Sequence, residues 1–185
     1  VSLADRLEQR DDRLADRECR FMDAFTHMLG RHSRQSPDAP GLIACILAWG
    51  TNMGIARMGQ RSDIGYHALV SASDNFLRPE TLREANDRVS NAIAQLPIFR
   101  HYDIGDTVHS SSDGQKFETG VRTFTARHSP KYWGLKKGIV PYTANANHVP
   151  INAYNIGADE HESHFVCDIL FNNSTDIQPE IHATD

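Results

Sequence analysis

Cysteine is scarce in this sequence of 185 residues, and long hydrophobic runs are missing from it. The three cysteines, Cys19, Cys45 and Cys167, are odd in number and widely spaced, which argues against a disulfide framework and favours a reducing compartment. The longest apolar run, from Gly41 to Trp49, is much shorter than the roughly 20 residues that span a bilayer. The N-terminus also lacks the apolar segment of a signal peptide. We therefore expect a soluble, cytoplasmic chain that does not enter a membrane.

Positive charge is absent from the last quarter of the chain, since no Lys or Arg occurs from Gly138 to Asp185. The net charge of −5 conceals an opposite bias just before this region. There, the segment from Lys116 to Lys137, which we name the basic segment, contains one acid, Glu118. A basic segment followed by an acidic one indicates that positive charge is concentrated in one part of the protein surface. The net charge of the whole chain does not reveal this asymmetry.

The first hundred residues have helical periodicity. Apolar residues at spacings of three, four and seven predict an amphipathic helix that begins near Leu3 and ends near Gly30. Asp38-Ala39-Pro40 then favours the start of a second helix, in which Leu42 to Trp49 is mostly buried and which ends at Gly50. A third helix is predicted between Pro79 and Pro97, with one apolar stripe formed by Leu82, Ala85, Val89, Ile93 and Leu96. The sequence thus predicts a helical region over residues 1–106.

After residue 106 the helical periodicity ends and strand patterns begin. We expect strands at 138–145, 149–156 and 180–184, with a turn at Asn147-His148 and a short helix from about Asp159 to Asn172. A first strand that carries Asp113 completes the order, but residues 107–112 are too polar for the pattern alone to predict it. The inner face of that helix should carry Phe165, Val166, Ile169 and Leu170. This order, three antiparallel strands, a helix and a strand, resembles the first half of the ribonuclease H-like α/β fold, in which the first and fourth strands lie side by side. The predicted class is therefore α+β, with a partial ribonuclease H-like domain at 107–185.

Several ordered blocks make a more specific resemblance. HSSSDGQKF at 109–117 is followed by ARHSPKYWGLKKG at 126–138, ANHVPINA at 146–153, EHESH at 160–164 and PEIHATD at 179–185. Upstream, ILAWGTNMG at 46–54 and TLREAND at 81–87 continue the pattern. Together these blocks resemble the transposases of the Tn3 family, which are replicative transposases of bacterial mobile elements. The resemblance covers the chain from about Ala39 onward.

The resemblance implies that Asp113 and Asp185 correspond to the first two acids of a catalytic Asp-Asp-Glu set. Such carboxylates bind Mg²⁺, with Mn²⁺ as a substitute, because hard cations prefer oxygen ligands. Two such ions stabilise the attacking and leaving oxygens when a phosphodiester is cleaved and a DNA 3′ end is transferred to a target. The third acid of the family, a Glu, lies further downstream than the sequence extends. We therefore expect this chain to be catalytically silent on its own and only marginally folded.

The basic segment is expected to contact DNA, through cations that meet phosphates and aromatic rings that stack on an unpaired base. The resemblance implies as partners the terminal inverted repeats of a transposon and a target DNA, and a homo-oligomer for the full-length protein. The alternative for this segment is a solvated loop whose aromatic rings pack inward. The candidate DNA-binding residues are Lys116, Arg122, Arg127, Lys131, Lys136 and Lys137.

Two other functions remain open at this point. A non-catalytic DNA-binding or dimerising remnant of a transposase would keep the helical region and the basic segment, and Val1 in place of Met suggests a cut fragment or a processed chain. A generic ribonuclease H-like nuclease is less favoured, because the motifs continue into the helical region. Zinc would need three or four converging ligands, so His161 and His164, with Cys167 further along, are assigned to polar surface or to contacts near the active site instead. No role is predicted for His109, His148 or His182.

Overall fold

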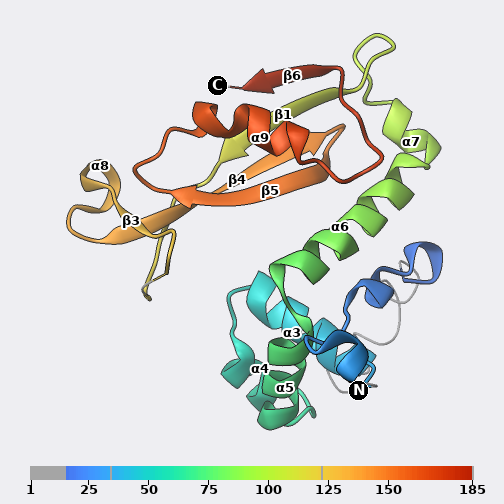
Figure 1. Ribbon diagram of the computed structural model, residues 1–185, viewed down its shortest axis with the longest axis vertical. Coiled ribbons are helices and arrows are strands. Elements are labelled where there is room, and N and C mark those ends of the chain that lie inside the picture. The colour runs from blue at the N-terminus through green and yellow to red at the C-terminus, as the bar shows by residue number, and fades with distance from the viewer. Residues whose placement is uncertain (1–15, 34, 122, 185) are drawn as a thin grey trace. The chain divides into compact units, whose positions relative to one another are not determined.

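The computed structural model describes residues 16–33, 35–121 and 123–184 and shows a mixed α+β chain (Figure 1). The chain divides into two compact units, residues 1–89 and residues 90–185. Unit 1 is helical in its described part, whereas unit 2 contains a six-stranded mixed sheet. In the described part of the chain no helix is long and apolar enough to cross a bilayer.

Unit 1 is built around helix α3, Ala39–Gly50, with α4, Ile55–Arg61, and α5, Tyr66–Phe76. The predicted start of α3 is confirmed, because the Asp38 side chain accepts a hydrogen bond from the Gly41 N–H at 3.0 Å and Pro40 lies in the first turn. Cys45 is fully buried in this unit, and burial raises the pKa of its thiol to about 11. The thiol therefore packs as a small apolar group and stays protonated near neutral pH.

The predicted amphipathic helix ending near Gly30 is wrong over its described part, while residues 1–15 lie outside the described residues. Residues 16–19 are helical, and two short 3₁₀ helices follow, η1 at Phe21–Ala24 and η2 at Gly30–His32. Arg20 has a left-handed φ of 52°, which interrupts the helix. Buried Ala24 and Phe25 belong to an apolar cluster with residues of α3 and α5. These apolar residues are therefore buried by tertiary packing, although the segment that carries them is not a continuous helix.

Helix α6, Pro79–Ala94, confirms the third predicted helix. Only part of its predicted stripe is buried: Ala85 is, whereas Leu82 and Leu96 are about half exposed. Pro97 begins the one-turn helix α7, Pro97–Arg100, as proline in a first helical turn commonly does.

The sheet of unit 2 has the strand neighbours β5-β4-β1-β6, with the short strands β2 and β3 also paired to β4. Strands β1, β4 and β5 are antiparallel, and β6 runs parallel to β1, which confirms the predicted adjacency of the first and fourth strands. The strands span His109–Gly114 (β1), Phe117–Glu118 (β2), Arg127–His128 (β3), Lys137–Ala146 (β4), Val149–Gly157 (β5) and Ile181–Thr184 (β6).

The connections of unit 2 follow from local chemistry. Asn147 and His148 both have positive φ, 47° and 66°, so the predicted hairpin turn between β4 and β5 is confirmed with the backbone twist that two-residue hairpins favour. The helix predicted from Asp159 is shorter than expected: 3₁₀ helix η3 spans Glu162–Phe165 and α9 spans Val166–Phe171. A turn closed by the Glu160 N–H on the Gly157 carbonyl occupies the first predicted residues. One further turn of helix, α8 at Pro130–Trp133, lies in the basic segment.

Pro141 lies inside β4, where it cannot donate a ladder hydrogen bond. Strand β1 ends with the pair Gly114–Tyr142, and β2 begins with the pair Phe117–Ile139. The Pro141 carbonyl accepts the Gln115 N–H at 3.1 Å between these two pairs. The missing N–H therefore falls opposite the break between β1 and β2, and the strand tolerates the proline.

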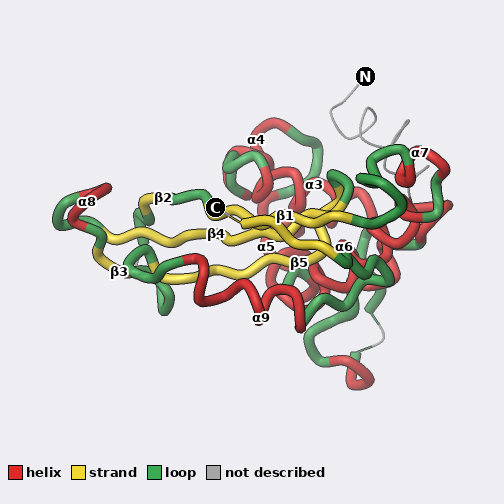
Figure 2. The backbone as a smooth tube through the Cα atoms, turned by 90° about the horizontal axis from the view of Figure 1, so that it is seen from above, coloured by secondary structure: helices red, strands yellow, loops and turns green. Residues whose placement is uncertain are grey.

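Helix α9 covers one face of the sheet (Figure 2). Buried side chains of β4 and β5 form the core on this face, including Val140, Tyr142 and Ile151, and Ile169 of α9 is fully buried among them. The predicted inner face of the helix is confirmed, because Phe165, Val166 and Leu170 also pack against this cluster. We call this side of the sheet the covered face and the other side the open face.

Candidate functional site

Asp113 lies on the open face of the sheet, near the end of the central strand β1. It is paired with Thr143 of β4, and its side chain is exposed. Its Oδ1 accepts the N–H of Gly114 at 2.8 Å, which fixes one carboxylate oxygen. The second oxygen has no hydrogen-bond partner among the described residues and is available to a ligand.

Asp185, the second predicted acid, lies outside the described residues. The last described residue, Thr184, pairs with Ser112 in the parallel β1–β6 ladder. Asp113 follows Ser112 in the sequence, just as Asp185 follows Thr184.

The open face around Asp113 is polar. Ser111 and Asn145 form a register pair two residues from the Asp113–Thr143 pair, so all four side chains project from the same side of the sheet. The covered face alternates with it and holds Ser110 and Ser112. The strand thus presents Ser111 and Asp113 to solvent and Ser110 and Ser112 to the interior.

Behind Asp113, His182 joins β6 to β1 on the covered face. Its Nδ1 lies 2.8 Å from Ser110 Oγ and its Nε2 lies 2.9 Å from Ser112 Oγ, and Ser112 also hydrogen-bonds the hydroxyl of the fully buried Tyr142. A neutral imidazole has one donor and one acceptor nitrogen and satisfies this pair. Burial lowers the pKa of His182, which favours that neutral form. No role was predicted for His182 from the sequence, because its contacts depend on the register in which β6 pairs with β1.

The residue after Asp113 allows a close approach from η3. A side-chain Cβ at Gly114 would lie 2.6 Å from Glu162 Oε1 and 2.7 Å from Val140, so only glycine fits without displacement of these groups. Glu162 Oε1 forms an ion pair of 3.2 Å with Lys116, whose ammonium also lies 5.0 Å from the centroid of the Tyr132 ring. Lys116, a predicted DNA-binding residue, is therefore engaged within the protein.

The other predicted DNA-binding residues lie in the basic segment near β2, β3 and α8. Arg127 donates to the Phe124 carbonyl at 2.7 Å, Lys136 pairs with Glu118 at 2.8 Å, and Lys131 lies 5.2 Å from the Tyr132 ring centroid. Lys137 is exposed, and Arg122 lies outside the described residues. A hollow of about 630 Å³ is lined by Lys136 and Lys137, among others. The structure thus gathers several cations at one end of the sheet.

The apolar side chains of the basic segment do not all pack inward. Phe124 is 92% exposed and Leu135 is 94% exposed. The alternative of a loop with inward-packed aromatic rings is wrong for Phe124, while Trp133 is partly buried against the core of unit 2.

The donor set fits a divalent cation at Asp113 only in part. An exposed carboxylate with an available oxygen suits Mg²⁺ or Mn²⁺, but the described residues contain no group of three His, Cys, Asp or Glu side chains close enough to share an ion. His161 bonds Ser163 through Nδ1 at 2.8 Å. The described part of the chain therefore supplies one carboxylate ligand, Asp113.

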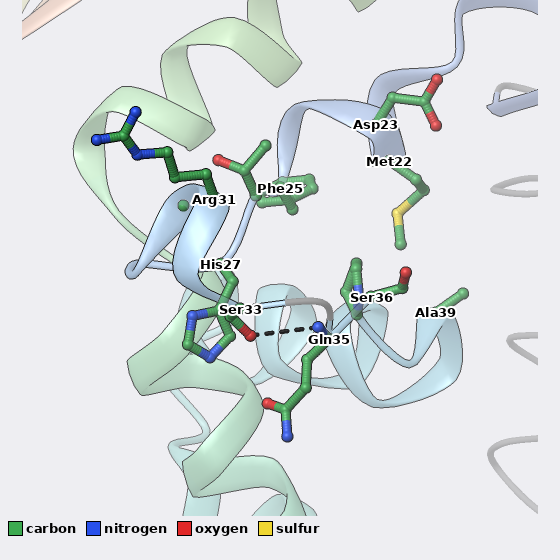
Figure 3. Close-up of a pocket in the computed structure, with 12 residues that line it drawn as sticks. Met22, Asp23, Phe25, His27, Arg31, Ser33, Gln35, Ser36 and Ala39 are labelled. Carbon is green, nitrogen blue, oxygen red and sulfur yellow. Dashed lines mark hydrogen bonds between the residues drawn. The ribbon is translucent and has the colours of Figure 1, made fainter.

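A second region with a hollow lies in unit 1. Figure 3 shows this hollow, of about 760 Å³, between η1, η2 and the start of α3, where Ser33 Oγ accepts the Gln35 N–H at 3.2 Å. Its lining includes Asp23, His27 and Arg31 but none of the predicted site residues. It therefore adds nothing to the arrangement at Asp113.

Comparison with known proteins gives a consistent match. A family model described as the Tn3 transposase DDE domain matches residues 13–185. Similar relatives are the transposase for transposon Tn3926 of Escherichia coli, 31% identical over 168 residues, and the transposase for transposon Tn501 of Pseudomonas aeruginosa, 30% identical over 168 residues. Each alignment covers 89% of this chain and 16% of the relative. The transposase for transposon gamma-delta of Escherichia coli (strain K12) is 25% identical over 173 residues, 92% of this chain and 17% of the relative. The chain thus spans about one sixth of the length of these curated relatives.

Proposed function

The chain belongs to the family of the Tn3 transposase DDE domain, and from this premise we propose that it is part of an enzyme that cleaves DNA 3′ ends and transfers them to target DNA in replicative transposition. Asp113 and Asp185 are the proposed catalytic and metal-binding residues. The observation that carries this proposal is the exposed Asp113 carboxylate on the central strand, with one oxygen held by the Gly114 N–H and the other available.

The sheet supports a ribonuclease H-like assignment for residues 107–185, with a helical region at 1–106 before it. In this proposal β5, β4 and β1 are the three antiparallel strands, α9 is the following helix and β6 is the fourth strand. The Ser112–Thr184 pair precedes both acids in the sequence. The two carboxylates would therefore serve one site, which agrees with their proposed shared role.

The protein residues would bind and orient the reacting DNA. Mg²⁺, or Mn²⁺ as its substitute, held by Asp113 and Asp185, would stabilise charge on the attacking and leaving oxygens of the phosphodiester. The Gly114 N–H keeps the Asp113 carboxylate in one orientation, and the His182 hydrogen bonds to Ser110 and Ser112 hold β6 against β1. A preorganised carboxylate needs less rearrangement when charge develops.

The basic segment is the proposed DNA-contacting surface. Lys131 and Lys137 are exposed and can meet phosphates. Lys116, Arg127 and Lys136 make contacts within the protein, with Glu162, the Phe124 carbonyl and Glu118, and would shape this surface. Arg122 remains part of the proposal. The proposed partners are transposon terminal inverted repeats and target DNA, and the full-length protein would act as a homo-oligomer.

The experiment that tests the metal site is paramagnetic broadening in a ¹⁵N-labelled sample of the 185-residue chain. Substoichiometric Mn²⁺ should weaken the amide signals of Ser112, Gly114 and Thr143 first, because these residues surround Asp113 in β1 and β4. Excess Mg²⁺ should restore the signals. The matched variant Asp113→Asn keeps the shape of the side chain and should remove most of the effect.

Two results would count against this assignment. Broadening centred on Glu160 and Glu162, unchanged in Asp113→Asn, would place the cation elsewhere. DNA binding without any broadening near Asp113 would support the alternative function, a non-catalytic DNA-binding or dimerising remnant of a transposase.

A further inference from the structure

A hollow of about 550 Å³ lies at the end of the sheet where β1 begins and β4 ends. Its walls come from three parts of unit 2: the loop between α7 and β1, the neighbouring strands β1, β4 and β6, and the hairpin turn between β4 and β5. The residues that line it include Tyr102, Ile104, Ser111, Asn145, His148 and Ala183.

The hollow is on the open face, next to Asp113. Ser111 and Asn145 form the register pair two residues before the Asp113–Thr143 pair. Two residues of a strand advance by about 6.6–6.8 Å, which is comparable with the length of one nucleotide in an extended strand. A DNA strand whose phosphate reaches Asp113 would therefore place its neighbouring nucleotide over the hollow.

The lining has the chemistry of a base-binding site. Tyr102 is 48% exposed, and its ring meets the His148 ring edge to face at a centroid distance of 4.6 Å, which gives an aromatic wall. The Asn145 amide and the Ser111 hydroxyl have no hydrogen-bond partner among the described residues. None of the described lining residues is Lys, Arg, Asp or Glu. Neutral donors and acceptors beside an aromatic wall suit a nucleobase, whereas a phosphate would need cations.

The aromatic wall is held in place by the turn that carries it. Asn147 is 8% exposed, and its Nδ2 donates to the Phe99 carbonyl at 3.1 Å and to Asp103 Oδ1 at 2.6 Å. These bonds tie the β4–β5 turn to the segment that carries Tyr102. Because both halves of the wall are fixed before a ligand arrives, binding loses little side-chain entropy.

We propose that this hollow binds the nucleobase of the nucleotide adjacent to the one held at Asp113, by stacking on Tyr102 and His148 and by hydrogen bonding to Asn145. The inference rests on the proposed function, and it assigns to that site a base-binding pocket that the carboxylates and the basic segment do not provide.

The test compares two single-stranded oligonucleotides of equal length and charge, one with all its bases and one with abasic positions throughout. Tyr102→Ala should weaken binding of the base-containing strand by at least about fivefold, the effect of losing one base–aromatic stack. Asn145→Ala should also weaken it, through the loss of a hydrogen bond to the base. Binding of the abasic strand should not change. Tyr66→Ala is the matched control, because Tyr66 is 49% exposed and belongs to unit 1.

A second measurement separates this inference from the proposed function. Deoxycytidine, which has no phosphate, should shift the NMR signals of Tyr102 and His148 in the parent chain, whether or not the chain binds DNA. The His148 signals should not shift in Tyr102→Ala or in Asn145→Ala. Lys131→Ala combined with Lys137→Ala should leave this nucleoside titration unchanged and reduce the salt dependence of DNA binding by about one unit of slope per lost phosphate contact.

The possible outcomes differ clearly. Equal weakening of both oligonucleotides by Tyr102→Ala, or no nucleoside shift at Tyr102 and His148, would overturn the base-binding hollow and leave the metal proposal intact. A nucleoside shift in a chain that shows no Mn²⁺ broadening at Asp113 would support the hollow while the proposed function fails.

Discussion

The two faces of the sheet in unit 2 differ in what their side chains do. The covered face holds Val140, Tyr142 and Ile151 against Ile169 of α9, and its polar groups are bonded to one another through His182. The open face carries Asp113, Ser111 and Asn145, which have available oxygen or nitrogen atoms. Successive residues of a strand project to opposite sides of the sheet. The same strands therefore place the side chains that stabilise the fold on one face and the side chains available to a ligand on the other.

This difference explains why the site can be exposed without weakening the sheet. Residues on the open face have few packing partners to lose, so substitutions there are expected to change ligand binding more than folding. Substitutions on the covered face are expected to do the reverse. Three variants of decreasing effect on stability test the comparison.

The largest effect is expected from Ile169→Ala. Ile169 is fully buried between α9 and the sheet, and truncation of a buried Ile to Ala costs about 2–5 kcal/mol through lost transfer energy and the cavity that remains. Hydrogen exchange of the β4 and β5 amides should accelerate accordingly. The control is Ile98→Ala in α7, where Ile98 is 51% exposed and the change should stay within about 0.5 kcal/mol. Similar losses at both positions would show that the covered face is not the core of unit 2.

A smaller effect on stability, recognised by its pH dependence, is expected from His182→Asn. Because burial lowers the pKa of His182 in the fold from 6.5, the unfolded chain takes up a proton at a higher pH than the folded chain. The free energy of unfolding should therefore be highest above pH 6.5, fall as the pH decreases toward the folded pKa, and level off below it. Urea midpoints measured across this range should show less pH dependence in His182→Asn than in the parent.

The control for this titration is His101→Asn, since His101 is exposed. Its urea midpoints should follow the pH dependence of the parent. If His182→Asn and His101→Asn behave alike, the contacts of His182 with the two serines do not couple its protonation to folding.

The sequence predicted those parts of unit 2 that depend on local patterns. Alternation and the Asn147-His148 turn identified β4 and β5, and the resemblance led to Asp113. It did not predict the first helix correctly, because the spacing of Phe21 and Phe25 fits either a helix or an irregular segment packed on α3 and α5. Nor could it predict the His182 contacts, which join residues 70 and 72 positions apart and exist only because β6 pairs with β1 in one register.

The hollow beside Asp113 was equally beyond prediction from the sequence. Tyr102, Asn145 and His148 belong to different segments and meet only in the folded unit. No role was assigned to His148, because a lone histidine in a turn has no spacing that indicates a ligand. Helices α4 and α5 were also not predicted, since their apolar residues do not form a single strong stripe.

The smallest effect on stability is expected from Asp113→Asn, the variant that should abolish Mn²⁺ broadening. The Asp113 carboxylate is exposed, and its one described side-chain hydrogen bond comes from the adjacent Gly114 N–H. An Asn side chain has the same shape, and its carbonyl oxygen can accept the same bond. Folding should therefore change by no more than about 0.5 kcal/mol, as for other exposed substitutions, whereas a cation loses a charged oxygen ligand that a neutral amide does not replace. Hydrogen exchange of the β1 amides, measured without divalent ions in parent and variant, checks the first part. If Asp113→Asn accelerated hydrogen exchange as much as Ile169→Ala does, Asp113 would stabilise the strand itself. The open face would then contribute to folding as the covered face does, and the proposed difference between the two faces would be wrong.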